Sequence, residues 1–140
     1  MAEQAQAAPD IRREVRIEAS PEVVWAYFVD PGRIVRWMGR TATLDPRPGG
    51  AMRLDYGNGN VMGGAYVELD EPRRVAFTFG WEDPDQLVRP GGSLVEVELE
   101  PDGSGTLVRL RHSGLPTEEV ATHAEGWDYF LPRLTAAVAG

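Results

Sequence analysis

The chain has 140 residues, of which 42% are hydrophobic and none is cysteine, and it carries a formal charge of -8 with a pI near 4.7. A chain without cysteine has no disulfide, no thiolate metal site and no cysteine nucleophile. The acidic balance disfavours nucleic acid and anionic membranes as partners, because both attract concentrated basic surfaces. No apolar run reaches the length of a bilayer-spanning helix, so we expect one soluble domain, cytoplasmic by default and without membrane insertion.

The first ten residues, MAEQAQAAPD, lack the basic and apolar regions of a secretory signal. We expect residues 1–10 to form a flexible leader, because they are polar and terminal. The remainder shows no internal repeat and no long linker that would divide it. Residues 11–140 are therefore predicted to form a single domain.

Residues 11–18 alternate apolar and charged side chains, a pattern typical of a strand with one face in water. A helix start is predicted where Ser20 precedes a proline. A second proline, Pro31, ends this helix and begins another short one that runs to Trp37. The aromatic residues of the two short helices are expected to pack against a sheet.

From Arg40 to His112 short strands alternate with glycine and proline turns, which predicts sequential antiparallel pairing. The strand expected at 61–69 contains Gly63 and Gly64, a pair that indicates a bulge, a bend or the close approach of another backbone. Residues 82–92 carry prolines near both ends and mixed charge. This composition indicates a mobile loop that could cover the mouth of a pocket.

The last two predicted strands carry charges on one face. Glu96 and Glu98 are expected to face Arg109 and Arg111 across the strands, in pairs that set the register more than they stabilise the fold. The opposite face of the final strand ends at His112. That histidine therefore has the inward register.

Residues 117–138 place apolar side chains three and four positions apart, which predicts one long amphipathic helix with a buried stripe. Thr117, which follows a proline, is the expected N-cap. At roughly 1.5 Å per residue the helix is about 33 Å long, so the surface that covers it must be comparably long. A multi-stranded sheet meets that requirement.

The order of strand, two short helices, six strands and long helix, with segments such as ELDEPRRVAFTFGW and HAEGWDYFLPRL, resembles the helix-grip fold of the START and Bet v 1-like (SRPBCC) superfamily. More narrowly, the chain is similar to the family related to the C-terminal domain of the activator of Hsp90 ATPase. The resemblance implies an α+β fold in which a curved seven-stranded antiparallel sheet surrounds the long C-terminal helix over an apolar cavity. It does not imply one activity, because relatives include lipid carriers, hormone receptors, cyclases and dehydratases.

Aromatic and sulfur-containing side chains, with a few aliphatic neighbours, are the candidates to line that cavity, since a curled sheet and one helix cannot approach each other everywhere. Four of them, Tyr56, Tyr66, His112 and His123, could supply polar groups. Gly126 on the helix indicates either close strand contact or room for a ligand. The predicted ligand-binding residues are Trp37, Met52, Leu54, Tyr56, Met62, Tyr66, Phe77, Phe79, Trp81, Val97, His112, His123, Trp127, Phe130 and Leu131.

No catalytic residue is assigned. His112 and His123 are the only histidines and form a conceivable proton-transfer pair, but no acidic partner is placed near them by spacing. Their spacing is not that of a zinc site, so no metal and no cofactor are expected. Ser113 follows His112 directly but points to the other face of the strand, which makes a serine-histidine site improbable.

The preferred hypothesis is therefore the binding of a small hydrophobic or amphipathic molecule in an internal cavity between the sheet and the C-terminal helix. One alternative is an enzyme of the cyclase, dehydratase or hydrolase type, acting on a polycyclic or lipid-like substrate through a histidine or a tyrosine. The other is a co-chaperone-like module whose acidic surface meets a basic protein partner. The identity of the ligand and the oligomeric state stay open.

Overall fold

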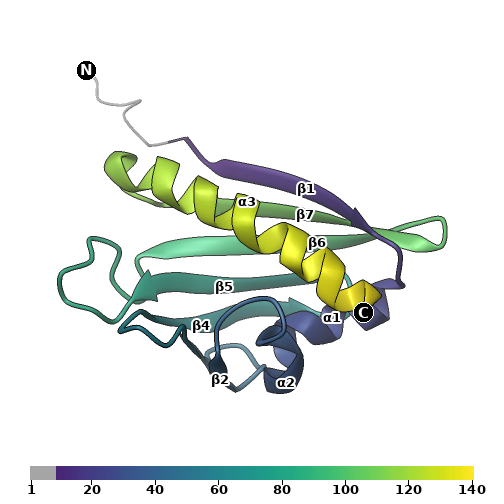
Figure 1. The fold of residues 1–140 in the computed structure, drawn as a ribbon, viewed down its shortest axis with the longest axis horizontal. Helices are drawn as coiled ribbons and strands as arrows, with labels where there is room; N and C mark the ends of the chain where they lie inside the picture. Colours follow the sequence, from purple (N-terminus) through teal and green to yellow (C-terminus); the bar gives the residue numbers. More distant parts are fainter. Residues whose placement is uncertain (1–8) are drawn as a thin grey trace.

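A computed structural model describes residues 9–140 as one antiparallel sheet with two short helices and one long helix (Figure 1). The α+β helix-grip fold expected from the sequence is confirmed. Most of the predicted leader, residues 1–8, lies outside the described residues. The strands are β1 (Ile11–Ile17), β2 (Thr41–Leu44), β3 (Ala51–Asp55), β4 (Val61–Asp70), β5 (Arg74–Trp81), β6 (Ser93–Asp102) and β7 (Gly105–Ser113), and the helices are α1 (Pro21–Val29), α2 (Pro31–Ile34) and α3 (Thr117–Ala139).

The seven strands follow the order β1-β7-β6-β5-β4-β3-β2 across the sheet, with every neighbouring pair antiparallel. Strands β2 to β7 are therefore a meander, because consecutive strands lie side by side. Helices α1 and α2 form the connection that carries the chain from one edge strand, β1, to the other, β2. Helix α3 lies across one face of this sheet and ends beside α1 (Figure 1).

The two short helices begin and end through local hydrogen bonds that the sequence signals. The hydroxyl of Ser20 accepts a hydrogen bond from the backbone N–H of Val23 at 3.3 Å and caps α1. Asp30 ends α1 by donating its backbone N–H to the Ala26 carbonyl at 2.9 Å. The same aspartate caps α2, because its carboxylate accepts the backbone N–H of Arg33 at 3.0 Å.

The first helical residue of α3 is Thr117, whereas a Thr117 N-cap would place the first helical residue at 118. Pro116 occupies the N-cap position, and no side chain in the part of the chain that the structure describes caps this end. The expectation that Thr117 caps the helix is wrong, because that threonine is already helical. The buried stripe is confirmed at Trp127, Leu131 and Leu134. None of the helices within residues 9–140 has both the length and the apolar content to cross a membrane.

The sheet face turned away from α3 carries a network of ion pairs. The register places Glu96 opposite Arg111 and Glu98 opposite Arg109, as the sequence predicts. Arg74 on β5 joins the network through a 2.7 Å contact with the carboxylate of Glu96. Such partly exposed pairs contribute little stability, about 0.2 to 1 kcal/mol each, so their main effect is on register.

A dense aromatic core lies between the sheet and the C-terminal half of α3. Trp37 is fully buried, and its indole N–H donates to the Tyr27 carbonyl at 2.9 Å. Its ring meets the ring of Phe28 edge to face at 5.4 Å. The hydroxyl of Tyr66 on β4 donates to the Phe28 carbonyl at 2.8 Å, and that of Tyr27 donates to the Ala137 carbonyl at 3.3 Å. Helices α1 and α2 are thereby fixed to both the sheet and α3.

The glycine pair in β4 permits close approach of the neighbouring strand. A Cβ atom on Gly64 would lie 1.9 Å from the backbone oxygen of Thr78, a distance that no side chain tolerates. The register irregularity of this strand lies instead between Tyr66 and Glu68. Of the three roles predicted for the glycine pair, close approach is therefore the one that Gly64 fulfils.

Residues 82–92 form a loop, and the loop is fastened to the end of β5. The backbone N–H of Trp81 donates to the Val88 carbonyl at 2.7 Å, and the Arg89 guanidinium donates to the Trp81 carbonyl at 3.0 Å. The side chain of Val88, a residue of this loop, is buried. The same loop contributes Gln86 to the wall of a cleft.

Candidate functional site

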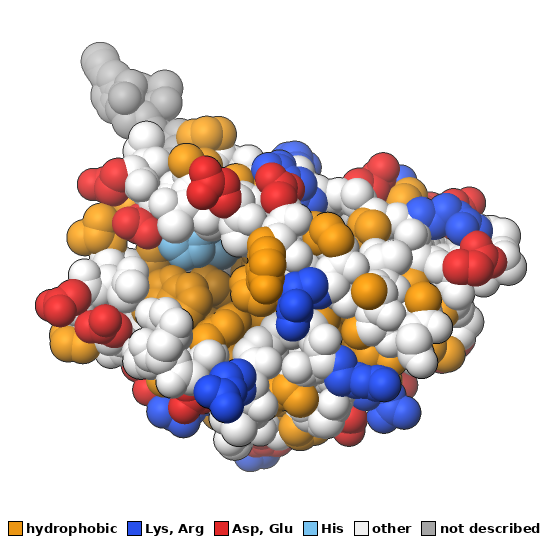
Figure 2. All heavy atoms as spheres, viewed as in Figure 1, with side chains coloured by type: hydrophobic (Ala, Val, Ile, Leu, Met, Phe, Trp, Pro, Cys, Tyr) orange, Lys and Arg blue, Asp and Glu red, His pale blue; other side chains and the backbone are white. Residues whose placement is uncertain are grey.

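An apolar cleft of about 290 Å³ opens between the N-terminal half of α3, the end of β5 and the loop of residues 82–92. Figure 2 shows it as a hollow with a largely hydrophobic floor and a histidine at its edge. Its volume lies just below the roughly 300 to 1,000 Å³ of ordinary small-molecule sites. The lining residues are Met38, Tyr56, Asn60, Phe79, Trp81, Gln86, Glu119, Thr122, His123, Gly126, Trp127 and Phe130.

Gly126 leaves part of this space open. Apart from its chain neighbours and the nearby backbone of its own helix, a Cβ atom added there would meet no heavy atom of the described chain within 4 Å. Close strand contact, one of the two roles predicted for this glycine, is therefore wrong. Gly126 instead leaves room above the floor of the cleft, at a cost to helix stability of about 1 kcal/mol relative to alanine.

The floor belongs to a cluster of five rings centred on Phe79, of which four line the cleft and the His112 ring lies behind them. The Phe79 ring meets the rings of Trp81, His112 and His123 edge to face, at centroid distances of 5.4, 4.9 and 5.9 Å. The ring of Trp127 lies 6.3 Å away. Edge-to-face contacts of this kind hold rings in fixed orientations, so the floor is a defined surface.

The protonation of His123 follows from its two partners. Its Nδ1 lies 2.8 Å from the Glu119 carbonyl oxygen, which only accepts, so Nδ1 carries the proton. Its Nε2 then accepts the indole N–H of Trp81 at 3.1 Å. Both nitrogens of this neutral ring are occupied, and the Trp81 indole is held against α3.

His112 has the opposite tautomer. Its Nδ1 accepts the indole N–H of Trp127 at 3.0 Å, so Nε2 must carry the proton. That Nε2–H donates to the hydroxyl oxygen of Ser93 at 2.8 Å, and the Ser93 hydroxyl donates to the Phe79 carbonyl at 2.8 Å. The chain of hydrogen bonds from indole to carbonyl is complete, and all of its members are buried.

This arrangement does not activate Ser93 as a nucleophile. A serine nucleophile needs a histidine nitrogen that accepts its proton, whereas here His112 donates to the serine and the serine proton points at a carbonyl. Burial is the main reason that the pKa of His112 falls to about 3. His112 is thus neutral at physiological pH and holds Trp127 in place.

Tyr56 differs from the other polar groups of the cleft. Its ring packs against Trp81 at 5.6 Å and against Phe130 at 5.8 Å. Its hydroxyl makes no hydrogen bond to any residue in the range 9–140. Burial raises the pKa of Tyr56 above its usual range, so the hydroxyl keeps its proton and can donate it to a ligand.

The predicted site residues fall into three groups. Six line the cleft, and His112 lies directly behind its floor. Leu131 lines a separate groove between α3 and β1. The cleft-lining residues are Tyr56, Phe79, Trp81, His123, Trp127 and Phe130. The others are buried in the packed core and do not line the cleft: Trp37, Met52, Leu54, Met62, Tyr66, Phe77 and Val97.

Two polar neighbours of the histidines, Ser93 and Glu119, were not predicted, although the periodicity of their own strand and helix places them there. Ser93 continues the inward alternation of Val95 and Val97 on β6, which places it beside His112. Glu119 lies four residues before His123 on α3, and its carboxylate is 3.7 Å from the histidine Nδ1. Within the described chain, no three side chains of the metal-binding types converge.

Comparison with known proteins places the chain among helix-grip proteins. The family model described as "Activator of Hsp90 ATPase homolog 1-like protein" matches residues 18–139. The solution structure of the AHSA1-like protein RHE_CH02687 from Rhizobium etli is 40% identical, with a TM-score of 0.74, and the match covers 98% of this chain and 88% of that one.

Two further relatives are longer than this chain. DynU16, a protein of the dynemicin biosynthetic locus, is 25% identical with a TM-score of 0.80, and the match covers 93% of this chain and 47% of DynU16. The uncharacterized protein C1711.08 of Schizosaccharomyces pombe is 28% identical over 128 residues, which cover 87% of this chain and 35% of that protein. The chain thus spans about half of the first and about a third of the second.

Proposed function

Since the chain belongs to the family of Activator of Hsp90 ATPase homolog 1-like proteins, we propose that it binds a small hydrophobic or amphipathic molecule in the cleft between β5 and α3. The main support for this proposal is the open space at Gly126, above the ring cluster of Phe79. Apolar walls with few polar groups are typical of small-molecule sites. A protein that needed only a stable core would gain by filling this space.

The polar groups of the cleft support binding more than catalysis. A general base needs a nitrogen free to accept a proton from the substrate. In His123 and His112 that nitrogen already accepts an indole N–H. Catalysis through either histidine would have to break a hydrogen bond that orients the floor, so the enzyme alternative is the weaker one.

The relatives also favour a small ligand. DynU16 is encoded in a biosynthetic locus, where small molecules are made and handled, and it shares this fold with 25% identity. Because the chain covers only about half of DynU16, we take from that relative the class of ligand and not its identity. The protein-interaction alternative rests on the family's description and on the acidic net charge of the chain.

The test is a titration with N-phenyl-1-naphthylamine, a neutral dye that fluoresces in apolar surroundings. The wild-type protein should bind it, and Gly126→Leu should weaken binding at least tenfold, because the new side chain fills the cleft. Ala136→Leu is the matched control, since it enlarges an exposed residue of the same helix outside the cleft. Circular dichroism would establish that all three proteins are folded.

Two results would overturn the proposal. If the folded wild-type protein does not bind the dye, the cleft is not a ligand site and the protein-interaction alternative becomes the better one. If both leucine variants bind as the wild type does, the dye lies elsewhere on the surface.

A further inference from the structure

The arginines of this protein divide into two classes. All 14 basic residues in the sequence are arginine. Ten of them make ion pairs with carboxylates among residues 9–140. In the same part of the chain the other four have no such partner, although the protein carries a net charge of -8. These are Arg36, Arg40, Arg89 and Arg133.

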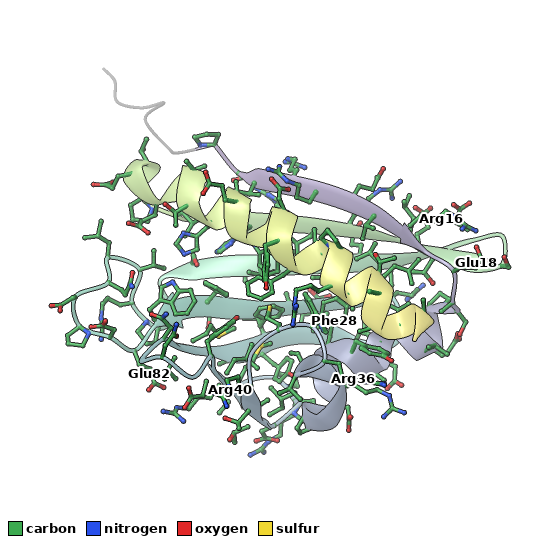
Figure 3. The ribbon with its side chains drawn as sticks, viewed as in Figure 1. Arg16, Glu18, Phe28, Arg36, Arg40 and Glu82 are labelled. Atoms are coloured by element: carbon green, nitrogen blue, oxygen red, sulfur yellow. The ribbon has the colours of Figure 1, made fainter. Side chains whose placement is uncertain are left out.

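Two of these four arginines lie at one end of the apolar cleft. The cleft continues into a second hollow of about 420 Å³ that Arg40 and Arg133 line. The two spaces share lining residues, among them Tyr56 and Phe130, so they are parts of one groove. Basic side chains border the hollow on this face of the molecule (Figure 2), and Arg40 lies on the side of α3 that faces β2 and α2 (Figure 3).

Both side chains are positioned by uncharged contacts. Arg133 donates its Nε–H to the Trp37 carbonyl at 3.3 Å and lies over the Tyr129 ring, 5.4 Å from its centroid. This leaves its two terminal nitrogens without an acceptor in the described structure. Arg40 packs against the β3–β4 turn, where a Cβ atom on Gly57 would come within 2.6 Å of its Cδ. Its guanidinium likewise has no acceptor within residues 9–140.

The opposite end of the groove has the opposite charge. Glu119 lines the apolar cleft beside His123 and is its one carboxylate within the described chain. An anion bound near Glu119 would be repelled, whereas one bound between Arg40 and Arg133 would meet two unpaired cations. The groove therefore distinguishes the two ends of an elongated ligand.

We propose that the ligand is an amphiphile with one anionic group, a carboxylate or a sulfonate, which binds Arg40 and Arg133 while its apolar body fills the cleft at Gly126. Guanidinium groups bind such anions through two parallel hydrogen bonds. The net charge of -8 disfavours anions in general, so this local pair of cations selects the anion and its orientation. This inference rests on the proposed function.

The test compares two dyes that share one ring system. N-phenyl-1-naphthylamine is neutral, and 8-anilinonaphthalene-1-sulfonate adds a single sulfonate. The wild-type protein should bind the sulfonate more tightly, and that preference should shrink as sodium chloride is added. Arg40→Gln and Arg133→Gln should each weaken binding of the sulfonate about three- to tenfold more than binding of the neutral dye.

Arg36→Gln is the matched control. Arg36 is also without an ion-pair partner among the described residues, but it lines neither part of the groove, and Figure 3 shows it nearer α1. The substitution removes the same unit of charge but outside the groove. It should therefore leave the preference for the sulfonate dye unchanged. A neutral dye that binds as tightly as the sulfonate, or a preference that survives the Arg40→Gln/Arg133→Gln double variant, would overturn the inference and leave the proposed function intact. Failure of both dyes would overturn the two together.

Discussion

The two ends of α3 cover the same sheet in different ways. At the C-terminal end, which we call the packed end, Leu134 and Trp37 are fully buried in a core completed by α1 and α2. At the N-terminal end, the open end, Gly126 faces open space and the rings of Trp81 and Tyr56 are only partly buried. The difference arises because α1 and α2 lie only at the packed end (Figure 1).

The two ends of α3 also differ in the hydrogen-bond acceptors that their buried aromatic side chains use. At the packed end, Trp37 and Tyr66 donate to backbone carbonyls, which fixes one element to another. At the open end, Trp81 and Trp127 donate to histidine side chains and so form a rigid floor without filling the space above it. Rigidity and close packing are therefore separate properties in this protein. The cleft can keep a fixed shape because its walls are hydrogen-bonded.

Truncating a tryptophan at each end should produce the largest contrast. Trp37→Ala removes a fully buried ring and should lower the free energy of unfolding by about 3 to 5 kcal/mol. Trp81→Ala removes a partly buried ring beside an existing cleft and should cost less than about 2 kcal/mol. Guanidinium chloride unfolding of both variants would measure this, and equal losses would show that the two ends are packed alike.

Acid should destabilise the open end through His112. Its pKa is about 3 in the folded protein and about 6.5 in the unfolded chain, so between these values only the unfolded chain binds the proton. Stability therefore falls as the pH falls, by about 1.4 kcal/mol per pH unit and about 2 to 3 kcal/mol between pH 6.5 and 4.5. His112→Gln should remove this part of the slope, because glutamine does not bind a proton in this range. A variant with the wild-type slope would mean that His112 is not the group responsible.

Removing a hydroxyl from each end should give a smaller contrast. Tyr66→Phe leaves the buried Phe28 carbonyl without its donor and should cost about 1 to 2 kcal/mol. Tyr56→Phe removes a hydroxyl without a hydrogen-bond partner in the described residues, so stability should change by less than about 0.5 kcal/mol. Thermal unfolding of the pair is the measurement. A large loss of stability in Tyr56→Phe would indicate that this hydroxyl contributes to the stability of the fold.

The smallest expected effect is a gain in the free energy of unfolding rather than a loss. Gly126→Ala places a Cβ atom in open space and restricts the unfolded chain, so it should stabilise the protein by about 0.5 to 1 kcal/mol. Urea unfolding would detect the gain. Destabilisation by this substitution would mean that the space above the floor is already filled.

Much of the fold is predictable because its signals are local. Ser20 and Asp30 cap their helices through contacts three residues away, and the alternation along β7 assigns His112 to the inner face without knowledge of any other strand. Ser93 follows from the alternation along β6, and Glu119 follows from the helical spacing of α3. These neighbours of the histidines could therefore have been predicted from the sequence. The pairing of Trp81 with His123 could not, because it joins β5 to α3 across 42 residues.

The sequence by itself determined the order of the elements, the buried stripe of α3 and the inward faces of the strands, since each of these depends on residues a few positions apart. Only the tertiary structure decided which aromatic residues form a solid core and which surround a cleft. Phe77 and Phe79 have the same register on β5, yet the first is in the core and the second forms the floor of the cleft. The physical reason is that a cavity is what remains after side chains from distant segments have filled the space between elements, and here α1 and α2 fill one end of that space alone.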